Sequence, residues 1–241
     1  MKLEGKVALI TGGGRGIGAA IAKRFVDDGA KIVISDIRDD LLQGVKKSLK
    51  AGMVETCAGD VTNFDDVKKM VAATVKFGGK IDVLVNNAGI DPGGSILDID
   101  IALWKKILDV NLNGPFLCMR AASRSMTGQG SGHIISVASI AGVRGRDGQA
   151  NYASSKAGLI GLTKAAAKEF GGANIQVNCV LPGLLPTDMG AAARERVHGQ
   201  VIAETTLGRT SNAVEVAAFI LHLSRMQNVS GQVFNLDSRI L

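Results

Sequence analysis

Two polar side chains in the second half of the chain have the types and spacing needed for proton transfer. Tyr152, the only tyrosine of the sequence, stands four residues before Lys156. A helix from Asn151 onward would place both on one face, about one turn apart. A nearby ammonium stabilises a phenolate, and bringing a tyrosine pKa from about 10 to about 7 takes roughly 4 kcal/mol of such stabilisation. The pair therefore predicts a general acid or base.

Ser139 is the third member of this candidate site. It ends the apolar run 133–139, which predicts a buried strand. Ligands of open α/β sheets bind outside the carboxyl ends of the strands, so its hydroxyl is expected to donate to a carbonyl oxygen while Tyr152 exchanges a proton with that oxygen. A serine that only ends a strand and a tyrosine that only packs on a helix would look the same, because Tyr-x-x-x-Lys is common by chance.

Apolar, β-rich runs alternate with segments of helical length along the whole chain. This alternation predicts a doubly wound α/β fold, a parallel sheet with helices on both faces. Because the chain has 241 residues and no repeat or linker, we expect one domain over 1–241. The predicted strands are 7–10, 31–35, 54–57, 81–85, 134–137, 175–180 and 232–236, and the predicted helices include 18–29, 65–77, 101–126, 151–170 and 213–224.

The composition excludes several classes of protein. Its 46% hydrophobic residues, 21% charged residues and 31 glycines are typical of a globular domain. The net charge of +6 is spread over separate segments, which favours an anionic substrate or cofactor over nucleic acid. Apolar runs are too short for a signal peptide or a membrane helix, so we expect a cytoplasmic protein without a membrane partner. The three cysteines are expected to be reduced, and the three histidines lack zinc-ligand spacing, so no metal is expected.

A glycine-rich turn, TGGGRGIG, joins the first predicted strand to the first predicted helix. Glycines there let the backbone approach a diphosphate, while the helix N-terminus adds amide donors and a positive dipole. One register, G-x-G-x-x-A, uses Gly14, Gly16 and Ala19. The other, G-x-x-x-G-x-G, uses Gly12, Gly16 and Gly18. The turn residues assigned to a dinucleotide cofactor are Gly12, Arg15, Gly16, Ile17 and Gly18.

Asp36, which follows the second predicted strand, bears on the choice of dinucleotide. Its carboxylate is placed to accept from both hydroxyls of the adenosine ribose, which is typical of NAD sites. Arg15 indicates the opposite, since a guanidinium in the glycine turn can hold the 2′-phosphate of NADP. We favour NAD, because an exposed arginine can swing away while a ribose-bound carboxylate must stay. NADP remains the alternative.

Small and polar residues follow three further predicted strands, where a cofactor would lie. Amides and hydroxyls at these ends can bind adenine, ribose and carboxamide, and small residues allow a close approach. The cofactor-binding candidates there are Asp60, Val61, Asn87, Ala88, Gly89, Pro182, Gly183, Leu185 and Thr187.

Together these motifs resemble the short-chain dehydrogenase/reductase family over essentially the whole chain. The residues that carry the resemblance are TGGGRGIG at 11–18, Asp60, NNAG at 86–89, Asn111, Ser139, YASSK at 152–156, Asn178 and PGLLPT at 182–187. The resemblance implies a Rossmann-type fold with a seven-stranded parallel sheet. It also implies a homotetramer.

The resemblance further implies hydride transfer between a nicotinamide cofactor and a secondary alcohol or ketone. Tyr152 would pass a proton to or from the substrate oxygen, while Ser139 would position the carbonyl. Lys156 would hold the nicotinamide ribose and depress the Tyr152 pKa, so Tyr152 and Lys156 are assigned to both catalysis and cofactor. Asn111 would hold a water that links Lys156 to solvent.

A substrate lid over about 184–206 is also implied. Thr187 and the backbone near Leu185 would orient the carboxamide, and 90–95 and 140–149, together with Leu184, would build the pocket walls. The candidate substrate contacts within the lid are Met189, Arg194, Arg196 and His198.

Within the family, TLGR at 206–209 and the ending SGQVFNLD resemble 3-oxoacyl-acyl-carrier-protein reductases and polyol or sugar-acid dehydrogenases. Reductases of the first kind commonly receive an acidic carrier on basic residues that 127–132 and 171–174 lack here, and they usually favour NADP, which Asp36 disfavours. The leading prediction is therefore an NAD-preferring dehydrogenase for a small alcohol or ketone. The alternative is a 3-oxoacyl-thioester reductase of fatty acid synthesis that uses NADPH.

Overall fold

The computed structural model describes residues 3–185, 199 and 202–240. In this part of the chain seven strands form one sheet in the order β3-β2-β1-β4-β5-β6-β7, and every neighbouring pair is parallel. The predicted seven-stranded parallel sheet is thus confirmed. The strands are β1 Val7–Thr11, β2 Lys31–Asp36, β3 Val54–Ala58, β4 Val83–Asn86, β5 Gly132–Val137, β6 Ile175–Pro182 and β7 Val233–Leu236.

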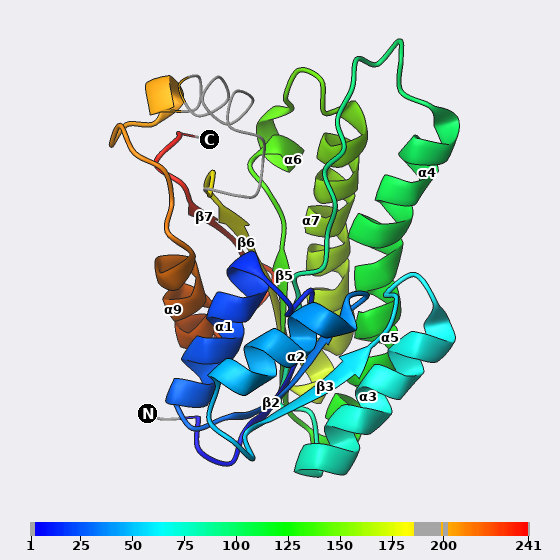
Figure 1. The fold of residues 1–241 in the computed structure, drawn as a ribbon, viewed down its shortest axis with the longest axis vertical. Helices are drawn as coiled ribbons and strands as arrows, with labels where there is room; N and C mark the ends of the chain where they lie inside the picture. The colour runs from blue at the N-terminus through cyan, green and yellow to red at the C-terminus, as the bar shows by residue number, and fades with distance from the viewer. Residues whose placement is uncertain (1–2, 186–198, 200–201, 241) are drawn as a thin grey trace.

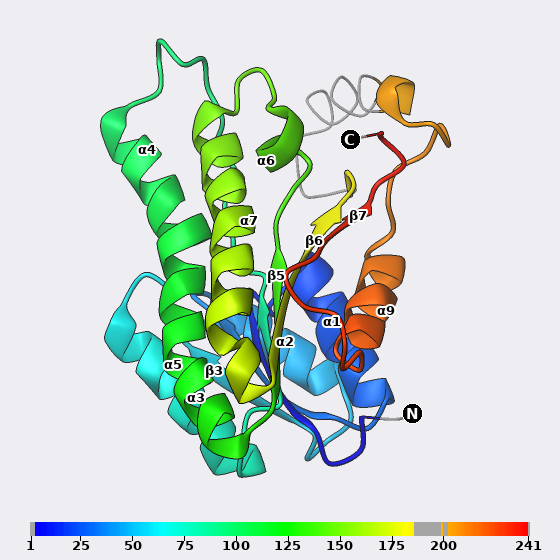
Figure 2. The same cartoon turned by 180° about the vertical axis from the view of Figure 1, so that it is seen from behind.

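Helices cover both faces of the sheet (Figures 1 and 2). Among the described residues, none of them is both long and apolar enough to cross a membrane. The helices are α1 Gly16–Asp27, α2 Asp39–Ser48, α3 Phe64–Gly78, α4 Ile101–Leu108, α5 Gly114–Gln129, α6 Ala141–Arg144, α7 Ala150–Phe170 and α9 Ala213–Leu223, with a π-helical turn at Asp109–Asn113 and a 3-10 turn at Gly171–Ala173.

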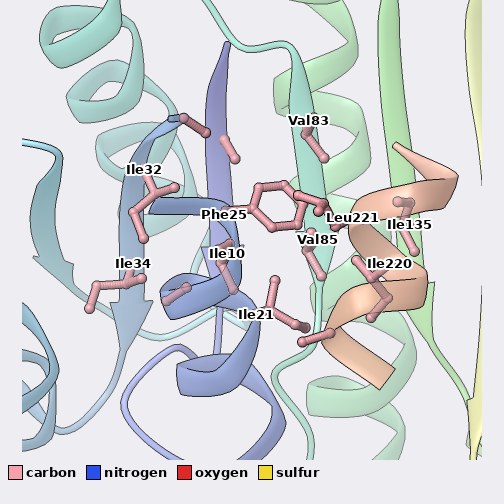
Figure 3. Close-up of a cluster of buried hydrophobic side chains, with 14 of the residues drawn as sticks. Ile10, Ile21, Phe25, Ile32, Ile34, Val83, Val85, Ile135, Ile220 and Leu221 are labelled. Atoms are coloured by element: carbon pink, nitrogen blue, oxygen red, sulfur yellow. The ribbon is translucent and has the colours of Figure 1, made fainter. Parts of the chain in front are cut away.

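Two apolar layers hold the helices against the sheet. On one face α1, α2 and α9 pack on the strands, and Phe25 and Ile21 of α1 meet Ile220 and Leu221 of α9 over the central strands (Figure 3). On the other face α3, α5 and α7 cover the sheet around residues such as Leu84. Strands buried on both faces read as continuous Val/Ile/Leu runs, which is why they could be predicted.

The segment predicted as one helix over 101–126 is helical but not uniform. α4 ends at Leu108, a π-helical turn covers Asp109–Asn113, and α5 starts at Gly114 with Pro115 in its first turn. Single π-helical turns inside helices are rare and occur often at functional sites. This turn contains Asn111, which is fully buried.

Candidate active site

The turn between β1 and α1 leaves no room for a side chain beside the backbone at Gly12 and Gly18. Gly12 has a φ of +63°, and a Cβ there would lie 2.8 Å from the Cα of Ala88. A Cβ on Gly18 would lie 2.0 Å from the carbonyl oxygen of Gly12. Gly16 is favoured for a different reason, since its φ of +55° is left-handed although the space around a Cβ would be open. A Cβ on Gly14, of the other register, would also lie close to a neighbour, 2.9 Å from the Leu41 Cβ, but this neighbour is a side chain rather than backbone. The geometry therefore favours the register of Gly12, Gly16 and Gly18.

The end of β4 is tied to this turn by hydrogen bonds. The Asn87 side-chain amide donates to the carbonyl oxygens of Thr11 (3.0 Å) and Gly12 (2.9 Å). The backbone amides of Asn87 and Ala88 both donate to the Thr11 hydroxyl, at 3.1 and 3.2 Å. Asn87 and Ala88 thus brace the glycine turn at the point where the strand order reverses, which is where open α/β sheets bind ligands.

The start of α1 fits a diphosphate group. Arg15 occupies the N-cap in an extended conformation without capping the helix through its side chain, and the first turn contains no acidic residue. Ile17 is half-buried and packs on the core below, so the helix end is fixed. A helix N-terminus without carboxylates offers amides and positive potential to an anion.

Asp36, predicted to follow the second strand, is the last residue of β2 and lies beside the glycine turn. Its carboxylate accepts from the backbone amides of Gly14 (3.4 Å) and Arg38 (3.2 Å), which hold it in place. Arg38 itself is bound through two contacts, of 2.8 and 2.6 Å, to Asp40. The carboxylate is therefore fixed at the edge of the site, and the neighbouring guanidinium of Arg38 already has an acidic partner.

Asp60 and Val61, which follow β3, have different environments. The Asp60 carboxylate accepts from the amide of Thr62 (2.8 Å), a local turn that uses one of its oxygens. Val61 is buried against Gly114 at the start of α5. Val61 therefore shapes the wall of the site from within the core.

At the end of β6, Pro182 and Gly183 lead toward the predicted lid. A Cβ on Gly183 would lie 2.1 Å from the Ser211 hydroxyl, so the chain passes very close to the start of α9. Leu185 is half-buried and is the last described residue before a gap. Thr187 and the lid candidates Met189, Arg194, Arg196 and His198 lie outside the described residues.

Tyr152, Lys156 and Ser139 come together at the carboxyl end of the sheet. α7 begins at Ala150, so Tyr152 and Lys156 share a helix face, and the Lys156 Nζ lies 5.6 Å from the Tyr152 ring centroid. The Lys156 Nζ donates to the carbonyl oxygen of Val137, the last residue of β5, at 2.8 Å. Ser139 lies two residues beyond that strand, and a hydrogen bond joins its side chain to Tyr152.

The pKa of Tyr152 differs from the expectation. Burial of the phenol and the nearby Asp91 carboxylate raise it to about 12, against the lowering effect of the Ser139 hydrogen bond. Lys156 does not depress it, because the ammonium is directed to the Val137 carbonyl rather than to the phenol oxygen. Tyr152 is therefore protonated at neutral pH.

Lys156 is itself a perturbed group. It is buried, and desolvation lowers its pKa to about 8. A Cβ on Gly89 would lie 3.6 Å from its Nζ and 3.3 Å from the Asn111 Oδ1, so these three residues adjoin. The Asn111 amide donates to the Ser155 hydroxyl at 3.1 Å. Perturbed groups gathered in this way are typical of active sites.

The segment after β4 carries residues that the sequence analysis treated only as a pocket wall. Asn111 Oδ1 accepts from the amide of Ile90 (2.9 Å), and Asn111 Nδ2 donates to the carbonyl oxygen of Ile90 (2.9 Å). Asp91 then lies close enough to Tyr152 and Lys156 to shift their pKa values. No spacing in the sequence could have shown this, because Asp91 is 61 residues from Tyr152.

The fold and this site define the class of protein. The chain belongs to the short chain dehydrogenase family, whose sequence profile matches residues 6–198. Members of this family are oxidoreductases that work with a nicotinamide cofactor.

The chain is similar to particular members of that family. It is 39% identical over 245 aligned positions to a 3-oxoacyl-acyl-carrier-protein reductase of Thermotoga maritima, with all of both chains covered. It is 38% identical over 242 positions to the enzyme of that name from Synechocystis, which covers 98% of this chain and 96% of the relative. It is 45% identical over 192 positions to the zerumbone synthase of Zingiber zerumbet, which covers 78% of this chain and 71% of the relative.

Proposed function

We propose that the chain interconverts a small secondary alcohol and its ketone, with Tyr152 exchanging the proton on the substrate oxygen. The observation that carries this proposal is that Ser139, Tyr152 and Lys156 lie together at the carboxyl end of β5. A bound nicotinamide cofactor supplies or accepts the hydride. Ser139 orients the carbonyl oxygen toward the phenol, and Lys156, one turn further along the same helix face, holds the nicotinamide ribose.

At neutral pH Tyr152 is in the protonation state that ketone reduction requires. With a pKa of about 12, Tyr152 holds its proton and can donate it as charge develops on the ketone oxygen. An alkoxide is a stronger base than a phenolate, so this transfer is downhill. Oxidation of the alcohol needs the deprotonated phenol and is therefore expected to accelerate as the pH rises.

We further propose that NAD(H) is preferred over NADP(H). The support is the Asp36 carboxylate, fixed by the amides of Gly14 and Arg38 where an adenosine ribose would lie. A carboxylate there accepts from ribose hydroxyls and repels a 2′-phosphate. Arg38 is engaged by Asp40, so it does not offset that repulsion without breaking two contacts.

The Asp36→Ser variant tests the cofactor preference. Wild type should show the higher kcat/KM with NADH on an activated ketone, and Asp36→Ser should raise the NADPH-to-NADH ratio about tenfold or more. Asp39→Ser, which removes an exposed carboxylate three residues away, is the matched control and should leave the ratio unchanged. A wild-type preference for NADPH that Asp36→Ser does not alter would contradict the proposal.

A second candidate function is reduction of a 3-oxoacyl thioester. It is favoured by the names of the relatives that match nearly the whole chain. The segments 127–132 and 171–174 contain no lysine or arginine for an acidic carrier, which counts against it. Efficient turnover of acetoacetyl thioesters with NADPH, and poor turnover of simple ketones, would make this the better assignment.

The resemblance to the family also supports a homotetramer, with a small molecule rather than nucleic acid or a membrane as the partner. Sedimentation of the purified chain would test the assembly. A monomer at micromolar concentration would contradict it.

A further inference from the structure

The loop after β4 is clamped against the helix that carries Tyr152 and Lys156. Figure 1 shows it rising beside the N-terminal end of α7 before it enters α4. The amide of Gly94 donates to the carbonyl oxygen of Gly148 (2.8 Å), and the Asn151 side chain donates to the carbonyl oxygen of Pro92 (3.3 Å). With Ile90 held by Asn111, the loop is fixed on both sides of Asp91.

Asp91 is fixed by its side chain as well. The Gln149 Nε2 donates to Asp91 Oδ2 at 2.6 Å, from a position three residues before Tyr152. The two segments approach so closely that a Cβ on Gly93 would lie 2.4 Å from the Gly148 carbonyl oxygen. The carboxylate therefore has a defined place next to the start of α7.

The charged and titratable groups around Asp91 are those of the candidate active site. Desolvation beside the start of α7 raises its pKa to about 6, although the residue as a whole is exposed, while Arg146 and Lys156 attract the carboxylate and act in the opposite direction. It is therefore mostly ionised at neutral pH. It raises the pKa of Tyr152, so its charge acts on the phenol that exchanges the substrate proton.

We propose that Asp91 determines substrate specificity by accepting a hydrogen bond from a hydroxyl near the reacting carbon and repelling an anion at that place. The substrate class is then a neutral hydroxyketone or polyol, and not a keto acid. This inference rests on the proposed function of the same site. A site built to accept from a substrate hydroxyl discriminates strongly, because its acceptor is left unpaired by the analogue that lacks the hydroxyl.

Arg146 is the residue that would favour the opposite selectivity, for a keto acid. Its half-buried guanidinium could attract a carboxylate into the same space. The Gln149 hydrogen bond argues against this arrangement, because it holds the negatively charged Asp91 carboxylate where the carboxylate of a keto acid would have to bind. A preference for the hydroxyketone would show that Asp91 controls selectivity, and a preference for the keto acid would show that Arg146 does.

The kinetic test compares 4-hydroxybutan-2-one, butan-2-one and acetoacetate, which share the reacting carbonyl. Wild type should prefer the hydroxyketone to acetoacetate, and Asp91→Asn should narrow that ratio about tenfold or more by removing the repulsion. Asp91→Leu should also remove the advantage of the hydroxyketone over butan-2-one. Asp98→Asn, an exposed carboxylate on the same loop, is the matched control and should leave all ratios unchanged.

A second measurement needs no turnover. Tyr152 is the only tyrosine, so an ultraviolet titration of phenolate absorbance reports its pKa directly. Asp91→Asn should lower that pKa by about half a unit or more, because a negative charge has been removed. An unchanged titration, or a wild-type preference for acetoacetate, would overturn the inference.

These results separate the inference from the proposed function. If the Asp91 variants leave the substrate ratios unchanged while ketone reduction still requires Tyr152, only the role of Asp91 is contradicted. Ketone reduction that continues without Tyr152 would remove the proposed function itself. A shifted Tyr152 titration in Asp91→Asn would still support the position of Asp91 in that case.

Discussion

Lys156 is a buried cation whose hydrogen-bond partner is a backbone carbonyl. Its Nζ donates to the Val137 oxygen at 2.8 Å and has no carboxylate at salt-bridge distance among the described residues. Burial of an ammonium without a carboxylate at salt-bridge distance costs stability. The pKa of about 8 is the measurable sign of that cost.

The stability of the protein should report this directly. The folded protein releases the Lys156 proton near pH 8, whereas the unfolded chain keeps it up to the ordinary pKa of 10.5. Between these values the unfolded state binds more protons, so the free energy of unfolding rises with pH. Relative to Lys156→Met, wild type should gain up to about 3 kcal/mol between pH 8 and pH 10.5. Urea unfolding of both proteins across that range gives the difference, and a constant difference would contradict the lowered pKa.

Residue types could be predicted at this scale, but their interactions could not. Tyr152, Lys156 and Ser139 were recognisable because helical spacing and a strand end place them together. The high pKa of Tyr152 was not predictable, since it depends on burial and on Asp91, which reaches the site through a loop. The lid residues around Thr187 lie outside the described part of the chain, and their roles stay predictions.

At the scale of elements, the contact between β1 and α1 sets the shape of the cofactor turn. The helix approaches its own strand so closely that Gly18 faces the carbonyl oxygen of Gly12. Such an approach is possible only without a side chain, which is why glycines at this turn could be predicted from their strand-to-helix position.

Gly18→Ala should therefore be damaging although alanine favours helices. Its Cβ would lie 2.0 Å from the Gly12 oxygen, so α1 must shift away from the turn. We expect a loss of stability of about 2 kcal/mol or more and weaker binding of NADH. Gly44→Ala in α2, with open space around the new Cβ, should instead stabilise by about 0.5 to 1 kcal/mol. Thermal unfolding with and without NADH measures both effects, and equal behaviour of the two variants would contradict this account.

The helical prediction over 101–126 shows the limit of periodicity. The apolar spacing correctly indicates helix, but the π-helical turn at Asp109–Asn113 adds a residue to one turn without leaving a signal in composition. Asn111 lies in that turn, where its side chain clasps both backbone groups of Ile90. The clasp joins segments that are 21 residues apart, so spacing alone could not reveal it.

At the scale of the whole molecule, helices from opposite ends of the chain share one core. α1 and α9 pack together over the central strands, as Figure 3 shows for Phe25 and Ile220. This contact brings the last quarter of the sequence against the first strand–helix unit. The order of elements predicted the layers of the fold, because parallel strands with right-handed crossovers allow few arrangements.

The shared core predicts that α9 contributes to the stability of the entire domain. Ile220 is fully buried on α9, so Ile220→Ala should lower the free energy of unfolding by about 2 to 5 kcal/mol. Val214 lies on the same helix but is 64% exposed, and Val214→Ala should stay within about 0.5 kcal/mol of wild type. Urea unfolding monitored by circular dichroism compares them. A small effect for Ile220→Ala would mean that α9 is not part of the cooperative core.

The measurement that tests the central claim most directly is the rate of NADH-dependent ketone reduction by Tyr152→Phe. NADH affinity is measured in parallel by the fluorescence of the bound cofactor. The variant lacks only the hydroxyl that donates the proton, so kcat/KM should fall about 100-fold or more while NADH binds nearly as in wild type. A variant that reduces ketones at the wild-type rate would contradict the role of Tyr152 as the proton donor.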